Sequence, residues 1–347
     1  MAVESFGVTL VLTKMIAIEI WIKHFPRMIT PALSVILLSY SDYVAVEWTV
    51  EHLARQSGRE KIELVLVMAK LKNPEDLSHF GFHSVRIVQT TGMKSRAVGM
   101  TKGVEQASAP IVAFLEDHSF PMAGWCEGIL AGYNDSISAV GPTMKNGNPQ
   151  SVVSWADILT GYGHVIEGKK YIGHCLAGHN CSYRRDVLLS YRDLLPHLLD
   201  CEVLIHEMFV RDGLSIRLID TAQVSHVNFE QLRGWLPGQF HHRRLHTGFR
   251  ARKWSRRNKA AFLLGSPLVP VVRSWRIIKN APVMEGQNRL VLATLLYLGQ
   301  VVSVSGELAG IIFGVGDAAA RLMPLEFDRD RYFSRGGTLR EVAPLRD

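Results

Sequence analysis

Three consecutive side chains that can bind a divalent cation follow a short apolar run near the middle of the chain. Glu116, Asp117 and His118 come directly after residues 111–115, which read IVAFL and are typical of a buried strand. Carboxylate oxygens and an imidazole suit Mn²⁺ or Mg²⁺ when a diphosphate supplies the remaining ligands. The sequence therefore predicts a divalent metal site, with Asp117 and His118 as metal ligands. A solvated turn that caps the next helix is the alternative.

Other charged residues are of the types that this chemistry needs. Lys94 and Arg96 lie at the start of a predicted helix, where cations can meet a phosphate. Glu202 lies on a helical segment, where a carboxylate can serve as a general base. Taken singly, each cation is more often a surface charge, and the alternative for Glu202 is an exposed acid at the N-terminus of a helix.

Apolar runs that alternate with helical stretches predict the elements that hold these residues. Strands buried on both faces and alternating with helices indicate a parallel α/β sheet. Ligands of such sheets bind beyond the carboxyl ends of the strands, where Ser39, Tyr40 and Asp42 end the first strand and Glu116 follows the fourth. The predicted strands cover residues 34–40, 63–68, 85–88 and 111–115, a further strand-like run covers 215–219, and the predicted helices cover 44–56 and 95–106.

The order of these features resembles glycosyltransferase family 2, the inverting, nucleotide-sugar-dependent enzymes with a GT-A fold. The resemblance covers roughly residues 33–228 and is carried by short segments in sequence. They are the first strand with LARQS at the end of its helix, the strand ELVLV, and the segments AVGMTKGVEQASAPIVAFLEDHS, GHNCSYRRDVL and EVLIHEMFVRDGLSIRLIDTAQVSH.

The resemblance implies a role for each candidate residue. Glu116, Asp117 and His118 take the place of the family's aspartate-rich metal motif, and Glu202 falls where the family carries its proposed general base. The donor side would contact the base, the ribose and the diphosphate, and the acceptor side would offer hydrogen bonds to sugar hydroxyls. The implied donor-binding residues are Ser39, Tyr40, Asp42, Lys94, Arg96, Glu116 and Asp117, and the implied acceptor-binding residues are Gly178, His179 and Asn180.

Several positions depart from the family's pattern. The last acidic position of the metal motif is His118 here, which changes the hardness and charge of the site and so its metal preference. Met68 and Ala69 follow the strand ELVLV, where the family carries acidic residues that help to hold the nucleotide. The string QLRGW from Gln231 to Trp235 lies near the place of the QxxRW motif of processive relatives, but out of its register, which favours a structural role.

Positive charge and long apolar runs concentrate in the last third of the chain, so the net charge of +7 is unevenly distributed. Residues 241–279 hold eleven cations and no anion, and residues 290–316 contain one charged side chain, Glu307, in 27 positions. Cations interleaved with apolar residues are typical of helices on an anionic lipid surface, and the second run is long enough to enter a bilayer. A buried hydrophobic helix is the alternative for residues 290–316.

These patterns divide the chain into four regions. We expect an amphipathic N-terminal segment over residues 1–30, a GT-A domain over 31–240, a basic and apolar membrane-associating region over 241–320, and a polar tail over 321–347. The four cysteines match no zinc, haem or disulfide pattern, which favours a reducing cytosol. The expected location is the cytoplasmic face of the cell membrane.

The leading hypothesis is an inverting glycosyltransferase at an anionic membrane surface. It would move a sugar from a nucleotide-diphosphate donor to a hydroxyl of a lipid-linked or cell-surface glycan acceptor, with Mn²⁺ or Mg²⁺ as cofactor. A catalytically inactive GT-A scaffold is one alternative, supported by Met68, Ala69 and His118. A nucleic-acid-binding protein that uses the basic region is another, but the sequence shows no DNA-reading motif, so nucleic acid is not an expected partner.

Overall fold

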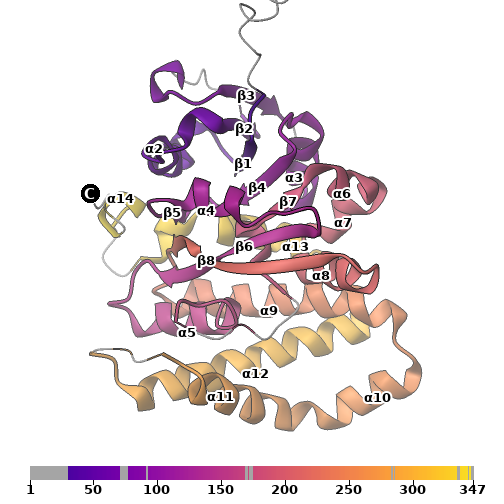
Figure 1. Cartoon of the computed structure of the whole chain (residues 1–347). Coiled ribbons are helices and arrows are strands. Elements are labelled where there is room, and N and C mark those ends of the chain that lie inside the picture. Colours follow the sequence, from indigo (N-terminus) through magenta and orange to yellow (C-terminus); the bar gives the residue numbers. More distant parts are fainter. Residues whose placement is uncertain are drawn as a thin grey trace, which may run out of the picture.

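The computed structural model describes residues 30–70, 77–90, 93–168, 171, 175–282, 284, 286–333, 337–342 and 344. The amphipathic segment predicted for residues 1–30 lies, apart from its last residue, outside this part of the chain. The described residues form a central sheet flanked by helices, with a layer of long helices along one side of it (Figure 1).

The sheet has eight strands in the order β3-β2-β1-β4-β7-β6-β8-β5. The first four in this order pair parallel, as do β6 and β8, whereas β7 is antiparallel to β4 and β6, and β5 is antiparallel to β8. This mostly parallel order confirms the predicted α/β sheet. The strands are β1 (Leu33–Ser39), β2 (Ile62–Met68), β3 (Ser84–Gln89), β4 (Ile111–Leu115), β5 (Ser119–Pro121), β6 (Ile137–Asn146), β7 (Ser182–Arg184) and β8 (Ser215–His226).

Continuous burial explains why three strands form where the apolar runs predict them. Every side chain of β1, β2 and β4 is buried, as expected for strands covered on both faces. Each of these strands begins and ends within one residue of its predicted bounds. β3 differs from the prediction of a buried strand, because it lies at the edge of the sheet and its side chains are exposed or half-buried.

Helices connect the strands across the faces of the sheet. The helix predicted over residues 44–56 is a 3₁₀ turn followed by an α-helix, and the helix predicted over 95–106 begins one residue later. These elements are η1 (Tyr43–Ala45), α2 (Glu47–Ala54), α3 (Arg96–Gln106), α4 (Trp125–Ala131), α5 (Val152–Gly161), η4 (Gly178–Asn180), α6 (Arg185–Ser190), α7 (Leu195–Leu198) and α8 (Glu202–Arg211).

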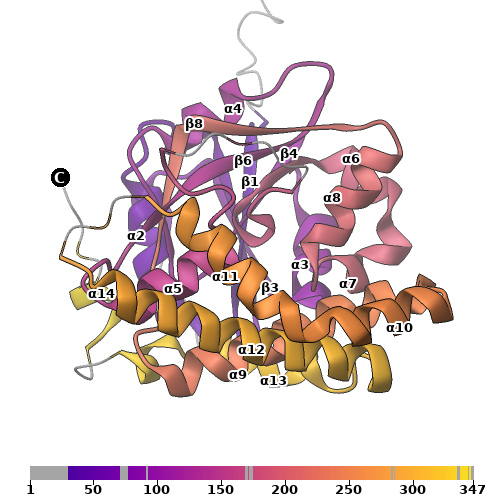
Figure 2. The ribbon, with the colours of Figure 1, turned by 90° about the horizontal axis from the view of Figure 1, so that it is seen from below.

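Long helices that follow the sheet in sequence form the layer along its side (Figures 1 and 2). They are α9 (Leu232–Arg250), α10 (Arg256–Gly265), the 3₁₀ turn η7 (Ser266–Leu268), α11 (Val269–Lys279) and α12 (Arg289–Phe313). α12 packs along α9, and α11 packs on α12. Glycines allow the close approach of α12, because a Cβ at Gly306 or Gly310 would overlap the backbone of α9 at Phe240 or Arg244.

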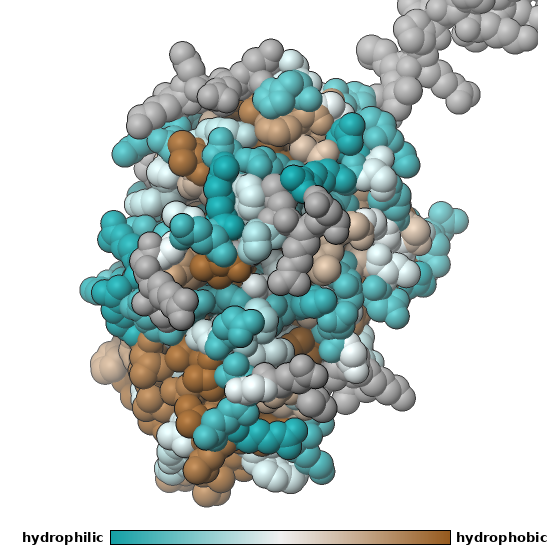
Figure 3. Space-filling view, turned by 90° about the vertical axis from the view of Figure 1, so that its left-hand side faces the viewer, coloured by the Kyte–Doolittle hydropathy of each residue, from teal (hydrophilic) through white to brown (hydrophobic). Residues whose placement is uncertain are grey.

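Part of the helical layer is apolar and exposed. Figure 3 shows apolar side chains gathered on the lower part of the molecule. Residues 256–279 and 289–313 are long and apolar enough to cross a membrane by length and composition, and 17% and 50% of their apolar windows are buried inside the protein. We call the exposed large apolar side chains of these helices the apolar surface: Leu263, Leu264, Leu268, Val271, Val272, Trp275, Ile278, Leu290, Val291, Tyr297, Leu298, Val301, Ile312 and Phe313.

The chain then returns to the sheet. The returning elements are α13 (Ala318–Glu326), the 3₁₀ turn η8 (Arg329–Tyr332) and α14 (Leu339–Val342). α13 packs against α9, and Leu322, Met323, Glu326 and Arg329 are buried. This part of the segment that we expected to be a polar tail is therefore packed into the protein, because its apolar side chains join hydrophobic clusters and its charged side chains have buried partners.

Candidate active site

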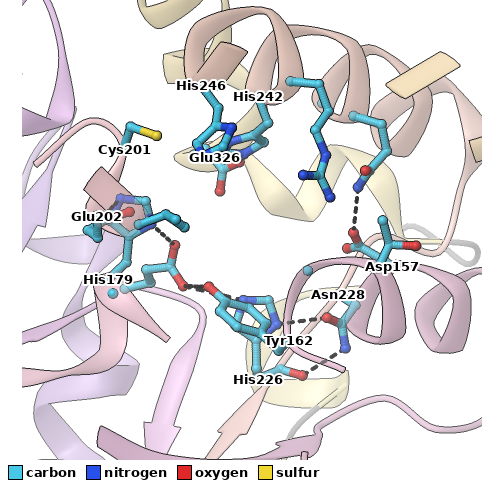
Figure 4. Close-up of a pocket in the computed structure, with 18 of the residues that line it drawn as sticks. Asp157, Tyr162, His179, Cys201, Glu202, His226, Asn228, His242, His246 and Glu326 are labelled. Atoms are coloured by element: carbon cyan, nitrogen blue, oxygen red, sulfur yellow. Dashed lines mark hydrogen bonds and ion pairs between the residues drawn. The ribbon is translucent and has the colours of Figure 1, made fainter. Parts of the chain in front are cut away.

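A cavity of about 310 Å³ lies at the carboxyl end of β4, between the sheet and the helical layer. Residues far apart in the sequence line it: Glu116 follows β4, His226 ends β8, and Glu202 begins α8. Glu326 ends α13 and Arg329 begins η8. Figure 4 shows the side chains of Glu202, His226 and Glu326 around the same space.

Glu116 is the centre of the hydrogen bonding in this cavity. Tyr162 Oη and Asn180 Nδ2 donate to its Oε2 at 3.1 and 2.8 Å, and Arg96 Nη1 lies 3.4 Å from its Oε1. Burial alone would raise the pKa of Glu116, but the surrounding imidazoles, above all His118, outweigh burial and hold this pKa well below its usual value. Glu116 is therefore a buried carboxylate that keeps its charge.

Glu116, His118 and His226 together form a group that can hold a metal ion, with one ligand atom from each within 4.8 Å of the others. His118 Nδ1 lies 2.7 Å from Asp117 Oδ1, and His226 Nδ1 lies 2.8 Å from Asn228 Oδ1. Each imidazole can thus donate its Nδ1 proton to an oxygen and keep Nε2 as the ligand atom. The residues present fit a divalent cation, and two imidazoles with one carboxylate suit Mn²⁺ better than Mg²⁺.

Asp117, which we predicted as a metal ligand, is outside the group of Glu116, His118 and His226. Its carboxylate contacts Nδ1 of His118, on the other side of that ring from the possible ligand atom Nε2. Burial raises the pKa of Asp117, and the adjacent His118 opposes the rise. We interpret Asp117 as the residue that orients His118. His226 is the third member of the group that can hold a metal ion, and the sequence did not predict it, because β8 continues beyond the predicted run 215–219.

The C-terminal segment contributes two charged residues that the sequence analysis did not identify. Arg329 Nη2 donates to His118 Nε2 at 2.8 Å and to Glu326 Oε2 at 2.9 Å. Its guanidinium carbon lies 3.8 Å from the ring centre of Phe229. Glu326 Oε2 is also 3.8 Å from Arg96 Nη1. A metal ion that binds His118 Nε2 therefore has to displace the hydrogen bond from Arg329.

Glu202, the predicted general base, lines the same cavity. It is the first residue of α8, where the helix dipole favours a carboxylate, and it is 8% exposed. Gly178 is needed beside it, because any Cβ at that position would overlap the Glu202 side chain. His179 Nε2 contacts Glu202 Oε1, and His179 Nδ1 lies 3.5 Å from Glu116 Oε1. Burial, then the charge of Arg96, lower the pKa of His179 to about 4, so a neutral imidazole separates the two carboxylates at pH 7.

Five of the predicted site residues share this cavity, and the others lie around it. Ser39 is buried and donates to the backbone oxygen of Asp42 at 2.6 Å, so it holds the loop after β1. Tyr40 is 46% exposed and stacks on Phe327, and Lys94 is exposed. The predicted residues that line the cavity are Arg96, Glu116, Gly178, His179 and Glu202, and those outside its lining are Ser39, Tyr40, Asp42, Lys94, Asp117, His118 and Asn180.

Several lining residues were not predicted, since they come from a strand end, turns and helices without a motif. Asp157 is one of them: its Oδ2 accepts a hydrogen bond from the Phe229 backbone and lies 3.9 Å from Arg329 Nη1. The unpredicted polar lining residues include Asp157, Tyr162, His164, His226, Asn228, Gln239, His242, Arg243, His246, Glu326 and Arg329.

A solved glycosyltransferase shares this architecture. The mannosyltransferase PcManGT from Pyrobaculum calidifontis, solved in complex with GDP-Man and Mn²⁺, is similar with a TM-score of 0.51 and 15% sequence identity. The similarity covers 83% of this chain and 88% of that chain. At this identity the likeness shows the fold, so the predicted GT-A-type fold is confirmed.

Two other solved structures are similar at a lower level. TarS from S. aureus is 13% identical over 80% of this chain and 54% of its own length, with a TM-score of 0.41. Glucosyl-3-phosphoglycerate synthase from Mycobacterium tuberculosis is 14% identical over 57% of this chain and 72% of its own, with a TM-score of 0.37. No protein-family model matches the sequence, and no curated protein is significantly similar to it.

Proposed function

We propose that this chain is an inverting glycosyltransferase of family 2 type, which moves a sugar from a nucleotide-diphosphate donor to a hydroxyl acceptor. The observation that carries the proposal is a single cavity lined by Glu116 and His226, two members of a group fit for a divalent metal, and by the separate buried carboxylate of Glu202. The GT-A-type fold supports the proposal, as does the presence of GDP-Man and Mn²⁺ in the similar mannosyltransferase.

Each charged group in the cavity has a part in this reaction. Glu202 accepts the proton of the acceptor hydroxyl, whose oxygen forms a bond to the anomeric carbon. The bond from that carbon to the diphosphate breaks on the opposite face, and its electron pair leaves with the diphosphate, so the anomeric configuration inverts. Arg96 would stabilise the charge of the leaving diphosphate. A divalent cation held by Glu116, His118 and His226 would supply further charge neutralisation there.

The test is a donor-turnover assay with the purified full chain. We expect release of a nucleoside diphosphate from at least one of a panel of GDP- and UDP-sugars in the presence of Mn²⁺. Release should stop when a chelator removes the metal and return when Mn²⁺ is added back. A chain that releases none from the whole panel, with either Mn²⁺ or Mg²⁺, would be the inactive scaffold instead.

We further propose that the enzyme works at the cytoplasmic face of a membrane, on a lipid-linked or cell-surface glycan acceptor. The apolar surface of α10, α11 and α12 supports this, because exposed apolar patches of this extent mark contact sites. Cations flank the same helices, among them Arg256, Arg257, Lys279 and Arg289. Apolar residues beside cations match the chemistry of an anionic lipid surface.

Membrane association predicts that the chain sediments with vesicles that contain an anionic phospholipid. Replacing Leu264 and Leu268 together with Ser should weaken this binding by at least about tenfold, since two exposed leucines lose their burial in the lipid. The matched control replaces Val44 and Leu194, which are also exposed but lie outside the helical layer, and should bind as the wild type does. Wild-type chain that stays in the supernatant at low salt would refute the membrane assignment.

A further inference from the structure

A second cavity, of about 320 Å³, lies next to the catalytic one. Three residues line both cavities: Thr160, His164 and Arg243. The remaining lining of the second cavity comes mainly from α11 and α12, the helices that carry the apolar surface. The second cavity therefore lies between the predicted general base and the part of the molecule that we assign to the membrane.

The second cavity is positively charged. Arg243, Arg273 and Arg276 line it, and no Asp or Glu does within the described part of the chain. Arg273 Nη1 is neutralised by Glu307 Oε1 at 2.8 Å, a buried partner on α12. Arg243 is half-buried and has no hydrogen bond or ion pair with the residues that the structure describes; burial lowers its pKa, and Glu307 opposes that change. Two guanidinium groups thus remain available for an anion.

Gln300 gives an independent indication of a polar ligand. Its side chain is 1% exposed, and it lines the second cavity from α12. Its Oε1 has no hydrogen-bond partner among the described residues. An unpaired buried amide oxygen is unfavourable, and a hydrogen-bond donor on a ligand, such as a sugar hydroxyl, would satisfy it.

α11 presents this cavity and the apolar surface side by side. Arg273, Arg276 and Ile277 line the cavity at helical spacing. Val272 and Trp275, each one position before one of these arginines, are exposed and belong to the apolar surface. A ligand with an anionic group in the cavity could therefore extend a hydrocarbon chain directly over α11.

We propose that the second cavity binds the phosphate or diphosphate of an amphiphilic acceptor, in which that group joins a sugar to a hydrocarbon chain. The sugar hydroxyl would then reach Glu202 through the shared lining at Arg243, and the hydrocarbon would lie over the apolar surface. This inference rests on the proposed function and specifies its acceptor. The donor diphosphate belongs at the other end of the catalytic cavity, beside Arg96 and Glu116.

The experiment is calorimetric binding of farnesyl diphosphate to the full chain in neutral detergent, without any donor. Arg276→Gln and Arg243→Gln should each weaken binding by about tenfold, as expected for the loss of one charge-assisted contact to phosphate. The matched control is Arg257→Gln, an exposed cation on α10 outside the cavity, which should bind within about twofold of the wild type. Farnesol should bind far more weakly than farnesyl diphosphate, and so should inorganic diphosphate.

Each other outcome overturns a defined part of the proposal. If Arg257→Gln and Arg276→Gln weaken the binding of farnesyl diphosphate equally, the ligand is attracted to the basic surface in general. If farnesol binds as tightly as farnesyl diphosphate, the protein does not recognise the phosphate. Equal binding of inorganic diphosphate would leave an anion site without a lipid. If the wild type turns over no donor but binds farnesyl diphosphate selectively, the proposed reaction fails separately from the lipid-phosphate site.

Discussion

Glu202→Gln slows sugar transfer by about two to four orders of magnitude, the usual contribution of a positioned general base. The amide keeps the shape of the side chain and its place beside His179, but it cannot accept the proton of the acceptor hydroxyl. Donor affinity should stay within about twofold of the wild type, because the residue lies at the start of α8 and away from the donor residues at β1. Single-turnover transfer and equilibrium binding of the donor measure the two effects separately.

Glu207→Gln is the matched control for this substitution. Glu207 is on the same helix and pairs with Arg250 at 3.2 Å on the surface, so removing its charge tests whether a change on α8 alone disturbs catalysis. The Glu207→Gln variant should transfer the sugar at the wild-type rate. A Glu202→Gln variant that loses donor affinity as strongly as transfer would make Glu202 a donor-binding or structural residue and not the base.

His226→Gln weakens Mn²⁺ binding by about a hundredfold or more and abolishes most donor turnover. The reason is that it removes one of three ligand atoms, whereas loss of a residue that only orients a ligand usually costs 10- to 100-fold. Electron paramagnetic resonance of free Mn²⁺ during a titration measures the affinity without any reaction. Asp117→Asn should weaken Mn²⁺ binding by only about 10- to 100-fold, since we interpret Asp117 as the partner that orients His118.

His246→Gln is the control for the metal group. His246 lines the same cavity from α9 but is not part of the group of Glu116, His118 and His226. The His246→Gln variant should bind Mn²⁺ with the affinity of the wild type. If both histidine substitutions weaken Mn²⁺ equally, the metal is bound somewhere else in the cavity, and the proposed ligand set is wrong.

Local sequence pattern predicts the buried strands of the sheet and the position of the ligand site at the end of β4. Apolar runs are found as β1, β2 and β4, because a strand that is buried on both faces is apolar at most of its positions. The end of β4 then marks where a ligand site of a parallel sheet must lie, which is why Glu116 could be identified from the sequence alone. Glu202 and His179 needed the order of motifs along the chain in addition.

The remaining site residues depend on contacts that no local pattern encodes. His226 ends a strand whose last residues alternate between buried and half-buried side chains and do not form an apolar run. Glu326 and Arg329 lie in a stretch rich in charged residues, which predicts solvent exposure, and they are buried only because they pair with each other and with residues far upstream. The role of Asp117 could not be predicted either, since adjacent residues point in directions that only the folded backbone sets.

The hydrogen bond between Arg329 and His118 joins residues 211 positions apart, so the site can be completed only late in the synthesis of these residues. Translation runs from the N-terminus, and domains fold as their residues emerge. The sheet with Glu116, His118 and Glu202 can therefore form on the ribosome before α13 and η8 have left the exit tunnel. Until then the charged cavity lacks the lining residues Glu326 and Arg329 and lies open to water on that side. A nascent chain of this protein would therefore acquire its complete site only after α13 and η8 have been synthesised and have emerged from the ribosome.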